Sequence, residues 1–288
     1  MNAYTTLKQN IRGLSDVTET IKVTERIAAS MLNSFKAQKM TLDEHTLALT
    51  ENLQRLLQFY SGKHPLLKSK ENGKKMLITI TGDKGLVGDY YHEIISVLLS
   101  NRQNYQEYIS IGEKGSGLLQ EENIALSVSI PVPDLAFKSE DITPPTAFIF
   151  DKFKQGDYKE IHVLYSRFHS LGYHEPVIIK LLPFEFANDI LQKSAGENNT
   201  YLGLPIFDTA KKDIFHYLLE KYIHIFFYHI CMEARLSELA ARIMAMENAK
   251  EKTKELTARY LRSYYKDRAM VITTKQLESF TVHKARYQ

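Results

Sequence analysis

The sequence predicts a mixed α/β protein in which an antiparallel coiled coil of N- and C-terminal helices carries an inserted Rossmann-like α/β domain. Neither Gly nor Pro occurs after Pro205, and neither occurs between Leu14 and Ser61, so both ends of the chain can form very long helices. The residues between these two segments contain short, β-rich apolar runs separated by turn residues. We therefore expect an N-terminal coiled-coil helix in 1–62, an α/β domain in 74–195 and a C-terminal coiled-coil helix in 206–288.

The composition limits the class of protein. Of the 288 residues, 44% are apolar, which is enough for an ordinary folded core. The net charge of +3 is slight and does not indicate nucleic-acid binding. The single cysteine, Cys231, excludes an internal disulfide and suits a reducing compartment. No apolar run reaches the ~18 residues of a membrane-spanning helix, so we expect no direct membrane insertion.

The N-terminal helix is predicted from apolar residues at helical spacing. Ser15 or Asp16 is its expected N-cap, and Gly62 and Pro65 are expected to end it. The residues expected to face its partner are Val17, Ile21, Ala28, Met31, Phe35, Leu42, Leu49, Leu53 and Leu56.

The C-terminal helix follows an expected loop at Gly196–Pro205. Its predicted seam residues are spaced by alternating steps of three and four, or multiples of these, as in a coiled coil: Ile214, Leu218, Ile225, Met232, Leu236, Leu239, Ile243 and Met246. A helix of this length cannot bury its own apolar stripe, so we expect it to pack against the N-terminal helix.

The segment between the helices alternates between strand and helix patterns. The apolar runs expected to form strands are Met76–Thr81, Tyr108–Ile111, Ala125–Ile130, Glu160–Tyr165 and Pro176–Leu182. The expected helices are Tyr90–Leu99, Ser116–Glu122 and Pro144–Phe153. This alternation predicts a mainly parallel, doubly wound sheet in which the last two strands pair as a hairpin.

The glycine-rich turn Thr81–Gly88 is the candidate small-molecule site, because a turn between a strand and a helix can bind phosphate through backbone N–H groups. Its glycines are three residues apart and match neither the Walker motif nor the dinucleotide fingerprint. We favour a structural turn, with a nucleotide-dependent enzyme as an open alternative. His162, His169 and His174 lack the spacing of a metal motif, and Cys231 lacks a nucleophilic context. We therefore predict no catalytic residue, cofactor or metal.

A resemblance to a known family emerges from several motifs. The block Ser237–Ala249, SELAARIMAMENA, resembles the S-E-x-x-A-R-M-x-A-M-x-x-A block of the gamma subunit of F-type ATP synthases. Lys22–Thr24 is similar to the family's K-I-T, and Ile80–Gly88 resembles its T-S-D-R-G-L-C-G turn. Ile111–Gly115 is similar to its G-R-K-G turn. The resemblance covers essentially the whole chain in the same order.

The resemblance implies a role and a set of partners. Gamma subunits form the central stalk, whose two terminal helices turn inside a hexamer of alpha and beta subunits and couple ion-driven rotation to ATP synthesis or hydrolysis. The epsilon subunit and the ring of c subunits would hold the α/β domain and the lower shaft. The chain would then have no catalytic activity of its own and would lie peripherally on the cytoplasmic face of a bacterial inner membrane.

The resemblance also implies contact residues. Polar contacts with the beta subunit would fall on Glu238, Arg242, Arg268 and Thr273. The sequence departs from the family pattern at Ala269, where a glutamine is usual, and also at Arg26–Ile27, Gly88–Tyr90 and His283–Gln288. These departures leave open a specialised paralogous rotary ATPase, for example a sodium-pumping one. A coiled-coil scaffold unconnected with ATP is the remaining alternative.

Overall fold

The computed structural model describes residues 3–59, 64–68, 72–131, 138–185 and 210–286. The expected loop at Gly196–Pro205 and the expected borders at 62, 195 and 206 lie outside these residues. The elements are α1 (Ala3–Phe59), η1 (Pro65–Leu67), β1 (Lys74–Ile80), α2 (Tyr90–Ser100), η2 (Arg102–Asn104), β2 (Glu107–Ile111), α3 (Glu113–Glu121), β3 (Val128–Ile130), α4 (Ser139–Gln155), β4 (Tyr158–Ser170), β5 (Tyr173–Leu182) and α6 (Lys211–Arg286).

The chain divides into two compact units. The smaller unit joins residues 1–29 to residues 242–288, and the larger unit spans residues 30–241. Each unit therefore contains one segment of α1 and one segment of α6, and the larger unit also contains the α/β domain.

The sheet of the larger unit has the order β3-β2-β1-β4-β5. Strand β1 pairs in parallel with β2 and with β4, and β2 pairs in parallel with β3. Strands β4 and β5 form an antiparallel hairpin. The predicted mixed, mainly parallel sheet is confirmed, because each parallel connection is long enough to include a crossover helix, whereas only a tight turn joins the last two strands.

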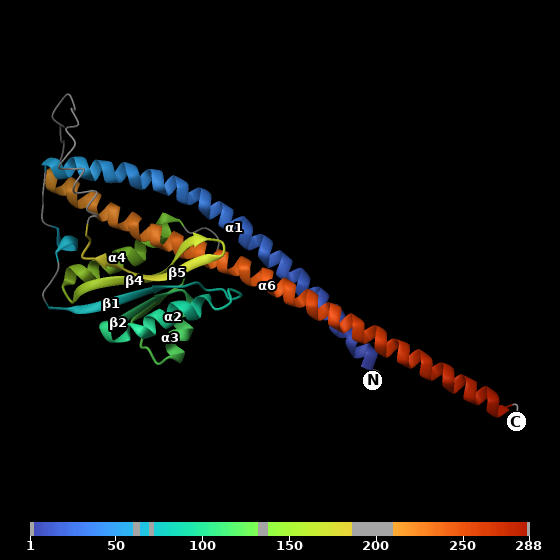
Figure 1. The fold of residues 1–288 in the computed structure, drawn as a ribbon. Coiled ribbons are helices and arrows are strands. Elements are labelled where there is room, and N and C mark those ends of the chain that lie inside the picture. The colour runs from blue at the N-terminus through green and yellow to red at the C-terminus, as the bar shows by residue number, and fades with distance from the viewer. Residues whose placement is uncertain (1–2, 60–63, 69–71, 132–137, 186–209, 287–288) are drawn as a thin grey trace. The chain divides into compact units, whose positions relative to one another are not determined.

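Helices cover both faces of this sheet, as a doubly wound fold requires. Helices α2 and α3 lie side by side on one face, and α4 lies on the other (Figure 1). The core between α2, α3 and the sheet contains Leu77, Ile94, Leu98, Leu119 and Leu164, all of them fully buried. The apolar faces of short amphipathic elements are thus buried against one another, which is the main source of stability in such a domain.

The two long helices pack against each other in antiparallel orientation within the larger unit. Lys39 of α1 contacts Glu233 of α6 at 3.1 Å, and Asp43 lies 2.5 Å from His229. Moving four residues forward in α1 corresponds to moving four residues back in α6, which defines the antiparallel register. Leu53 and Leu56 of the predicted α1 seam are buried, as expected for residues facing a partner.

Two expectations for α1 are wrong. The helix begins at Ala3 and not after Ser15 or Asp16, because it continues through Gly13 at a cost of only about 1 kcal/mol. The side chain of Val17 is 49% exposed, whereas Thr18, three residues before the buried Ile21, is partly buried.

The middle of α6 is buried on more than its predicted seam. Met232, Leu236 and Leu239 are buried as expected, but a second set of fully or almost fully buried residues lies on other faces of the helix: Phe215, Leu219, Ile223, Phe227 and Ile230. A helix that is apolar on most sides must be enclosed on most sides. This segment of α6 accordingly packs against the α/β domain as well as against α1.

The smaller unit contains a less enclosed helix pair. Ile21 and Ala28 of α1 are buried, as is Met246 of α6, and Lys250 forms an ion pair with Glu25 at 3.2 Å. The side chains of 272–283 are all exposed. Among the described residues, no helix has the length and apolar character needed to cross a lipid bilayer.

Candidate functional site

One polar site in the larger unit lies where α6 meets the carboxyl ends of β1 and β4. The hydroxyl of Ser237 donates to the backbone oxygen of Ser166 at 2.8 Å, just inside the end of β4. The hydroxyl of Tyr90, at the start of α2, donates to the backbone oxygen of Ala234 at 3.1 Å. In doubly wound folds this edge of the sheet is where ligands usually bind. Here the chain's own helix occupies the edge.

The glycine-rich turn after β1 allows this close approach. A Cβ atom at Gly82 would lie 2.6 Å from both the Glu238 carboxylate and the Tyr91 hydroxyl. A Cβ atom at Gly115 would lie 2.4 Å from Oγ1 of Thr81. These positions need glycine because neighbouring side chains fill the space that a Cβ would take. The start of the turn, at Gly82, therefore packs closely against Glu238 of α6.

The space left at this edge is too small for a nucleotide. A cavity of about 10 Å³ remains between the turn and α6, lined in part by Ile80, Thr81 and Cys231. Ligand pockets typically measure about 300–1,000 Å³, whereas this volume corresponds to at most one water molecule. Burial raises the pKa of the Cys231 thiol, which makes it a poor nucleophile. Within the described ranges, no group of three or more His, Cys, Asp or Glu side chains is arranged to hold a metal ion.

A buried ion pair faces the same turn. The Arg235 guanidinium donates to the Glu238 carboxylate at 2.7 Å, and the two side chains are 6% and 3% exposed. The residues are three positions apart on α6, so they lie on one face of the helix. An internal ion pair of this kind contributes modestly to net stability, but removing one partner leaves a charge in a poorly solvated place.

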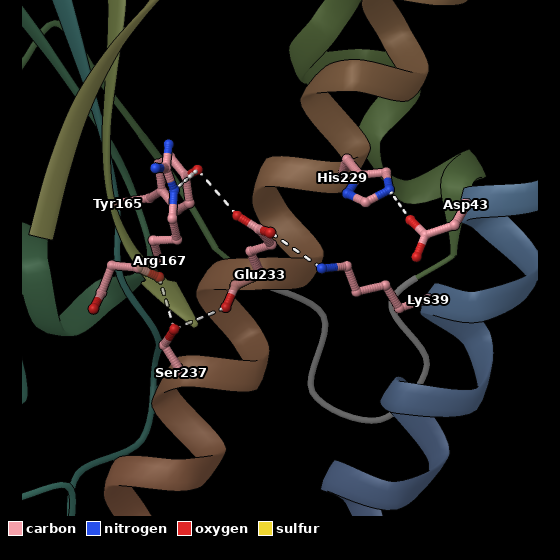
Figure 2. A network of polar contacts seen from close by, with 8 residues as sticks. Lys39, Asp43, Tyr165, Arg167, His229, Glu233 and Ser237 are labelled. Carbon is pink, nitrogen blue, oxygen red and sulfur yellow. Dashed lines mark hydrogen bonds and ion pairs between the residues drawn. The ribbon is translucent and has the colours of Figure 1, made fainter. Parts of the chain in front are cut away.

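A second network joins three elements through Glu233 (Figure 2). Its carboxylate accepts from the Lys39 ammonium of α1 at 3.1 Å and from the Tyr165 hydroxyl of β4 at 3.0 Å. Arg167 donates in turn to the Tyr165 hydroxyl at 3.4 Å. One turn along α6, Ser237 bonds both to Ser166 and to the backbone oxygen of Glu233. A single carboxylate thus connects the sheet, α6 and α1.

The electrostatics of this network keep Tyr165 a hydrogen-bond donor. Burial raises the pKa of the Tyr165 phenol to about 12, with a smaller contribution in the same direction from Glu233, while the nearby Arg167 acts in the opposite direction. The phenol is therefore protonated at any physiological pH, and its proton points to the carboxylate.

A third polar cluster lies where η1 and α4 meet the first turns of α6. The ring of His64 accepts a hydrogen bond from the backbone N–H of Leu66 at 3.1 Å and packs edge-on against His216. Glu220 lies 3.6 Å from His64 and pairs with Lys154 of α4 at 2.7 Å. Burial, together with the His216 ring, lowers the pKa of His64 to about 4, so this imidazole is neutral near pH 7.

Comparisons with known proteins identify the family of this chain. The family model described as ATP synthase matches residues 4–278. The ATP synthase gamma chain of Lachnoclostridium phytofermentans is 24% identical over 274 residues, covering 94% of each chain. That of Desulfitobacterium hafniense is 26% identical over 276 residues, covering 93% of this chain and 94% of the relative. This chain belongs to the gamma-subunit family of ATP synthases.

Solved structures support the gamma-family fold. The rotor of the Euglena gracilis mitochondrial ATP synthase superimposes with a TM-score of 0.54 at 19% identity, covering 92% of this chain and 99% of the other. The central stalk of the Tetrahymena thermophila mitochondrial ATP synthase gives a TM-score of 0.55 at 19% identity, with coverages of 80% and 99%. At this identity the likeness shows the fold alone, and it agrees with the predicted helix pair and inserted α/β domain.

The four contact residues that the family resemblance implied fall into two classes in this gamma-family chain. Glu238 is 2% exposed and paired with Arg235, and Arg242 is 7% exposed. Arg268 and Thr273 are exposed on the last part of α6. The structure therefore does not bring the four together on one accessible surface.

Sequence reasoning missed the residues that join the elements, namely Tyr165, Glu233 and Arg235. A signal was present for two of them, because Glu233 and Arg235 directly follow the apolar run 222–232 and lie on either side of Ala234. A charge within an apolar stretch of helix indicates a buried partner. No spacing rule identifies which distant residue supplies that partner.

Proposed function

We propose that this chain is the rotor shaft of a rotary ATP synthase, and that it has no catalytic activity of its own. The observation that carries the proposal is the family match over residues 4–278, supported by relatives matched over nearly their full length. A long helix pair attached to a compact α/β domain suits a shaft, because torque can pass from the domain to the helices only if the two are firmly joined.

In this proposal the partners are alpha and beta subunits around the helix pair, with the epsilon subunit and the c-ring at the α/β domain. The complex would lie on the cytoplasmic face of a bacterial membrane, with this chain peripheral to the bilayer. A shaft of this kind acts by presenting different contacts to chemically identical neighbours, and so stabilises a different state of each neighbour.

The direct contacts with the beta subunit are assigned to Arg268 and Thr273. Both are exposed, and a guanidinium can bind a partner's carboxylate through two parallel hydrogen bonds. Glu238 and Arg242 are less suited to direct contact, because both are buried. We propose that Glu238 supports the helix internally through Arg235.

The first test is assembly. Expressed with alpha and beta subunits from the same organism, the tagged chain should copurify with both in a stoichiometric complex. A chain that folds but brings down neither subunit would overturn the rotor assignment and favour the scaffold alternative.

The second test concerns the contact residues. Arg268→Glu should lower the ATPase activity of the assembled complex roughly tenfold, because a charge pair is replaced by a repulsion. Arg262→Glu is the matched control, since Arg262 is also an exposed arginine on α6. Equal activities for the two variants would remove Arg268 from the contact surface while leaving the rotor assignment intact.

A specialised rotary ATPase is the second candidate, favoured by two observations. The two relatives described above share only 24% and 26% identity with this chain, and Ala269 stands where the family usually has glutamine. Sodium-dependent ATPase activity of the purified complex, insensitive to a proton uncoupler, would identify a sodium-pumping member. Full activity without sodium would identify a proton-coupled one.

A further inference from the structure

The contact between α1 and α6 in the larger unit combines apolar layers with two polar ones. Each helix has buried apolar residues in this unit, among them Leu32, Phe35 and Leu53 of α1 and Met232, Leu236 and Leu239 of α6. Large apolar residues repeated every seven positions pack almost as well when one helix slides by a heptad, so such layers specify axial register weakly.

The polar layers discriminate between registers. In the observed register Lys39 meets Glu233 and Asp43 meets His229. A heptad slip in one direction would place Lys39 opposite Phe226 and Glu233 opposite Leu32. A heptad slip in either direction separates both pairs and leaves Lys39, Asp43 and Glu233 with no oppositely charged residue across from them. These partly buried charges then lose interaction free energy that they have in the native register.

A slip in the other direction is no better matched. It would place Lys39 opposite Ala240 and Glu233 opposite Thr46, neither of which can neutralise a charge. Glu233 has an additional constraint, because Tyr165 and the neighbouring Ser237–Ser166 bond attach this turn of α6 to the end of β4 (Figure 2). The sheet therefore fixes the position of the Glu233 carboxylate, with which Lys39 forms its ion pair.

We propose that the network around Glu233 is a register lock, which fixes the axial position of α1 against α6 and the α/β domain. Glu233 is its positioning residue, and Lys39 and Tyr165 are the two partners of Glu233. The Asp43–His229 pair is a second polar contact between the helices, one helical turn away. The lock determines which of several nearly equivalent apolar packings the two helices adopt. This role is a property of the chain itself and does not depend on the proposed function.

The proposal predicts an outcome that a merely stabilising network would not give. Spin labels are attached to cysteines introduced by Asn33→Cys in α1 and Lys221→Cys in α6, both at exposed positions of the larger unit. The native Cys231 is buried and should not react. A heptad slip displaces one helix by seven residues of about 1.5 Å each, so the axial separation of the labels changes by about 10 Å.

In the parent chain a single label-to-label distance is expected from double electron–electron resonance. The double substitution Lys39→Leu and Glu233→Leu should add a second distance population displaced by up to about 10 Å. The melting temperature should fall only slightly, because the ion pair is partly exposed and the main loss is the hydrogen bond from Tyr165 to Glu233. A single native distance in this double variant would overturn the register lock.

Two control variants and one replacement variant complete the test. The substitutions Glu51→Leu and Lys212→Leu add the same two leucines at exposed positions and should leave one native distance. Glu233→Gln retains an acceptor for Tyr165 and Lys39 and should also keep the native distance. If the double leucine variant does not fold, Lys39→Met alone replaces it, and a native single distance there would equally reject the proposal.

Discussion

The middle and the end of α6 belong to one continuous helix but are built from different kinds of sequence. Between 222 and 241 most side chains are buried, whereas every side chain from 272 to 283 is exposed. The first stretch contains Phe227, Leu236 and Leu239 and the paired charges of Glu233 and Arg235, while the second contains Leu277 and Phe280 on its surface. Both stretches are thus helical, whether or not their side chains are buried. The elements packed around each stretch decide how much its side chains contribute to stability.

The largest expected difference between the two stretches concerns phenylalanine. Phe227→Ala should destabilise the chain by about 3–5 kcal/mol, because Phe227 is 0% exposed and its removal leaves a cavity. Phe280→Ala should change stability by less than about 0.5 kcal/mol, because Phe280 is 73% exposed. Chemical denaturation of the isolated chain measures both, and similar losses would show that the exposed stretch is structurally enclosed in solution.

The buried ion pair gives the next contrast. Arg235→Met should cost about 3–5 kcal/mol, because Glu238 loses its cationic partner in a place where water reaches it poorly. Arg262→Met is the matched exposed control and should cost less than about 0.5 kcal/mol. Thermal melts at neutral pH would compare them, and a loss below about 1 kcal/mol for Arg235→Met would mean that Glu238 is solvated.

A pH-dependent effect should come from the cluster at the start of α6. His64 has its pKa lowered to about 4 in the folded chain, so the unfolded chain binds the extra proton first as the pH falls below 6.5. Stability should therefore decrease between pH 6.5 and 4, by at most about 1.4 kcal/mol per pH unit from this group. His64→Asn keeps a cap acceptor for the Leu66 N–H and should show a shallower dependence over this window. Identical profiles of stability against pH for the parent chain and His64→Asn would contradict the lowered pKa of His64.

A smaller effect is expected at the junction of β4 and α6. Tyr165→Phe removes the hydroxyl that donates to Glu233 and should cost about 0.5–1.5 kcal/mol, the usual net value of one hydrogen bond. The ring remains in place, so the apolar packing is preserved. Tyr265→Phe, at an exposed position of α6, is the control, and urea denaturation should show no loss for it.

The smallest effect is expected at the exposed ion pair of the smaller unit. Lys250→Met should change the free energy of unfolding by about 0–1 kcal/mol, because the side chains of Lys250 and Glu25 are 44% and 27% exposed and the pair is screened by salt. The difference from the parent chain should shrink further in 1 M salt. A loss that grows with salt would show that the side chain acts through packing instead of charge.

Sequence periodicity was sufficient for the elements and for part of the seam. The strand predicted at Met76–Thr81 and the helix predicted at Tyr90–Leu99 agree with β1 and α2 to within a few residues. The seam prediction was wrong at Val17, whose side chain is 49% exposed, whereas the adjacent Thr18 is partly buried. Apolar residues usually occupy the helix positions that face the partner. Which of two adjacent residues faces it depends on where the partner helix lies.

The candidate site was less predictable than the fold. The motif block implied partner contacts at Glu238 and Arg242, and these stay predictions; within this chain both side chains are buried. A motif records which residues a family uses and does not record whether a side chain faces a partner or the chain's own core. Glu233 and Tyr165 are far apart in sequence, and no local pattern connects them.

Local periodicity, turn residues and short motifs were enough to predict the two long helices, the order of strands and helices between them, and the family. They could not predict that α6 fills the edge of the sheet where a doubly wound fold would bind a ligand, or which charges α6 buries there. Burial and pairing depend on distances between residues remote in the chain, and those distances exist only once the helices and the sheet have packed.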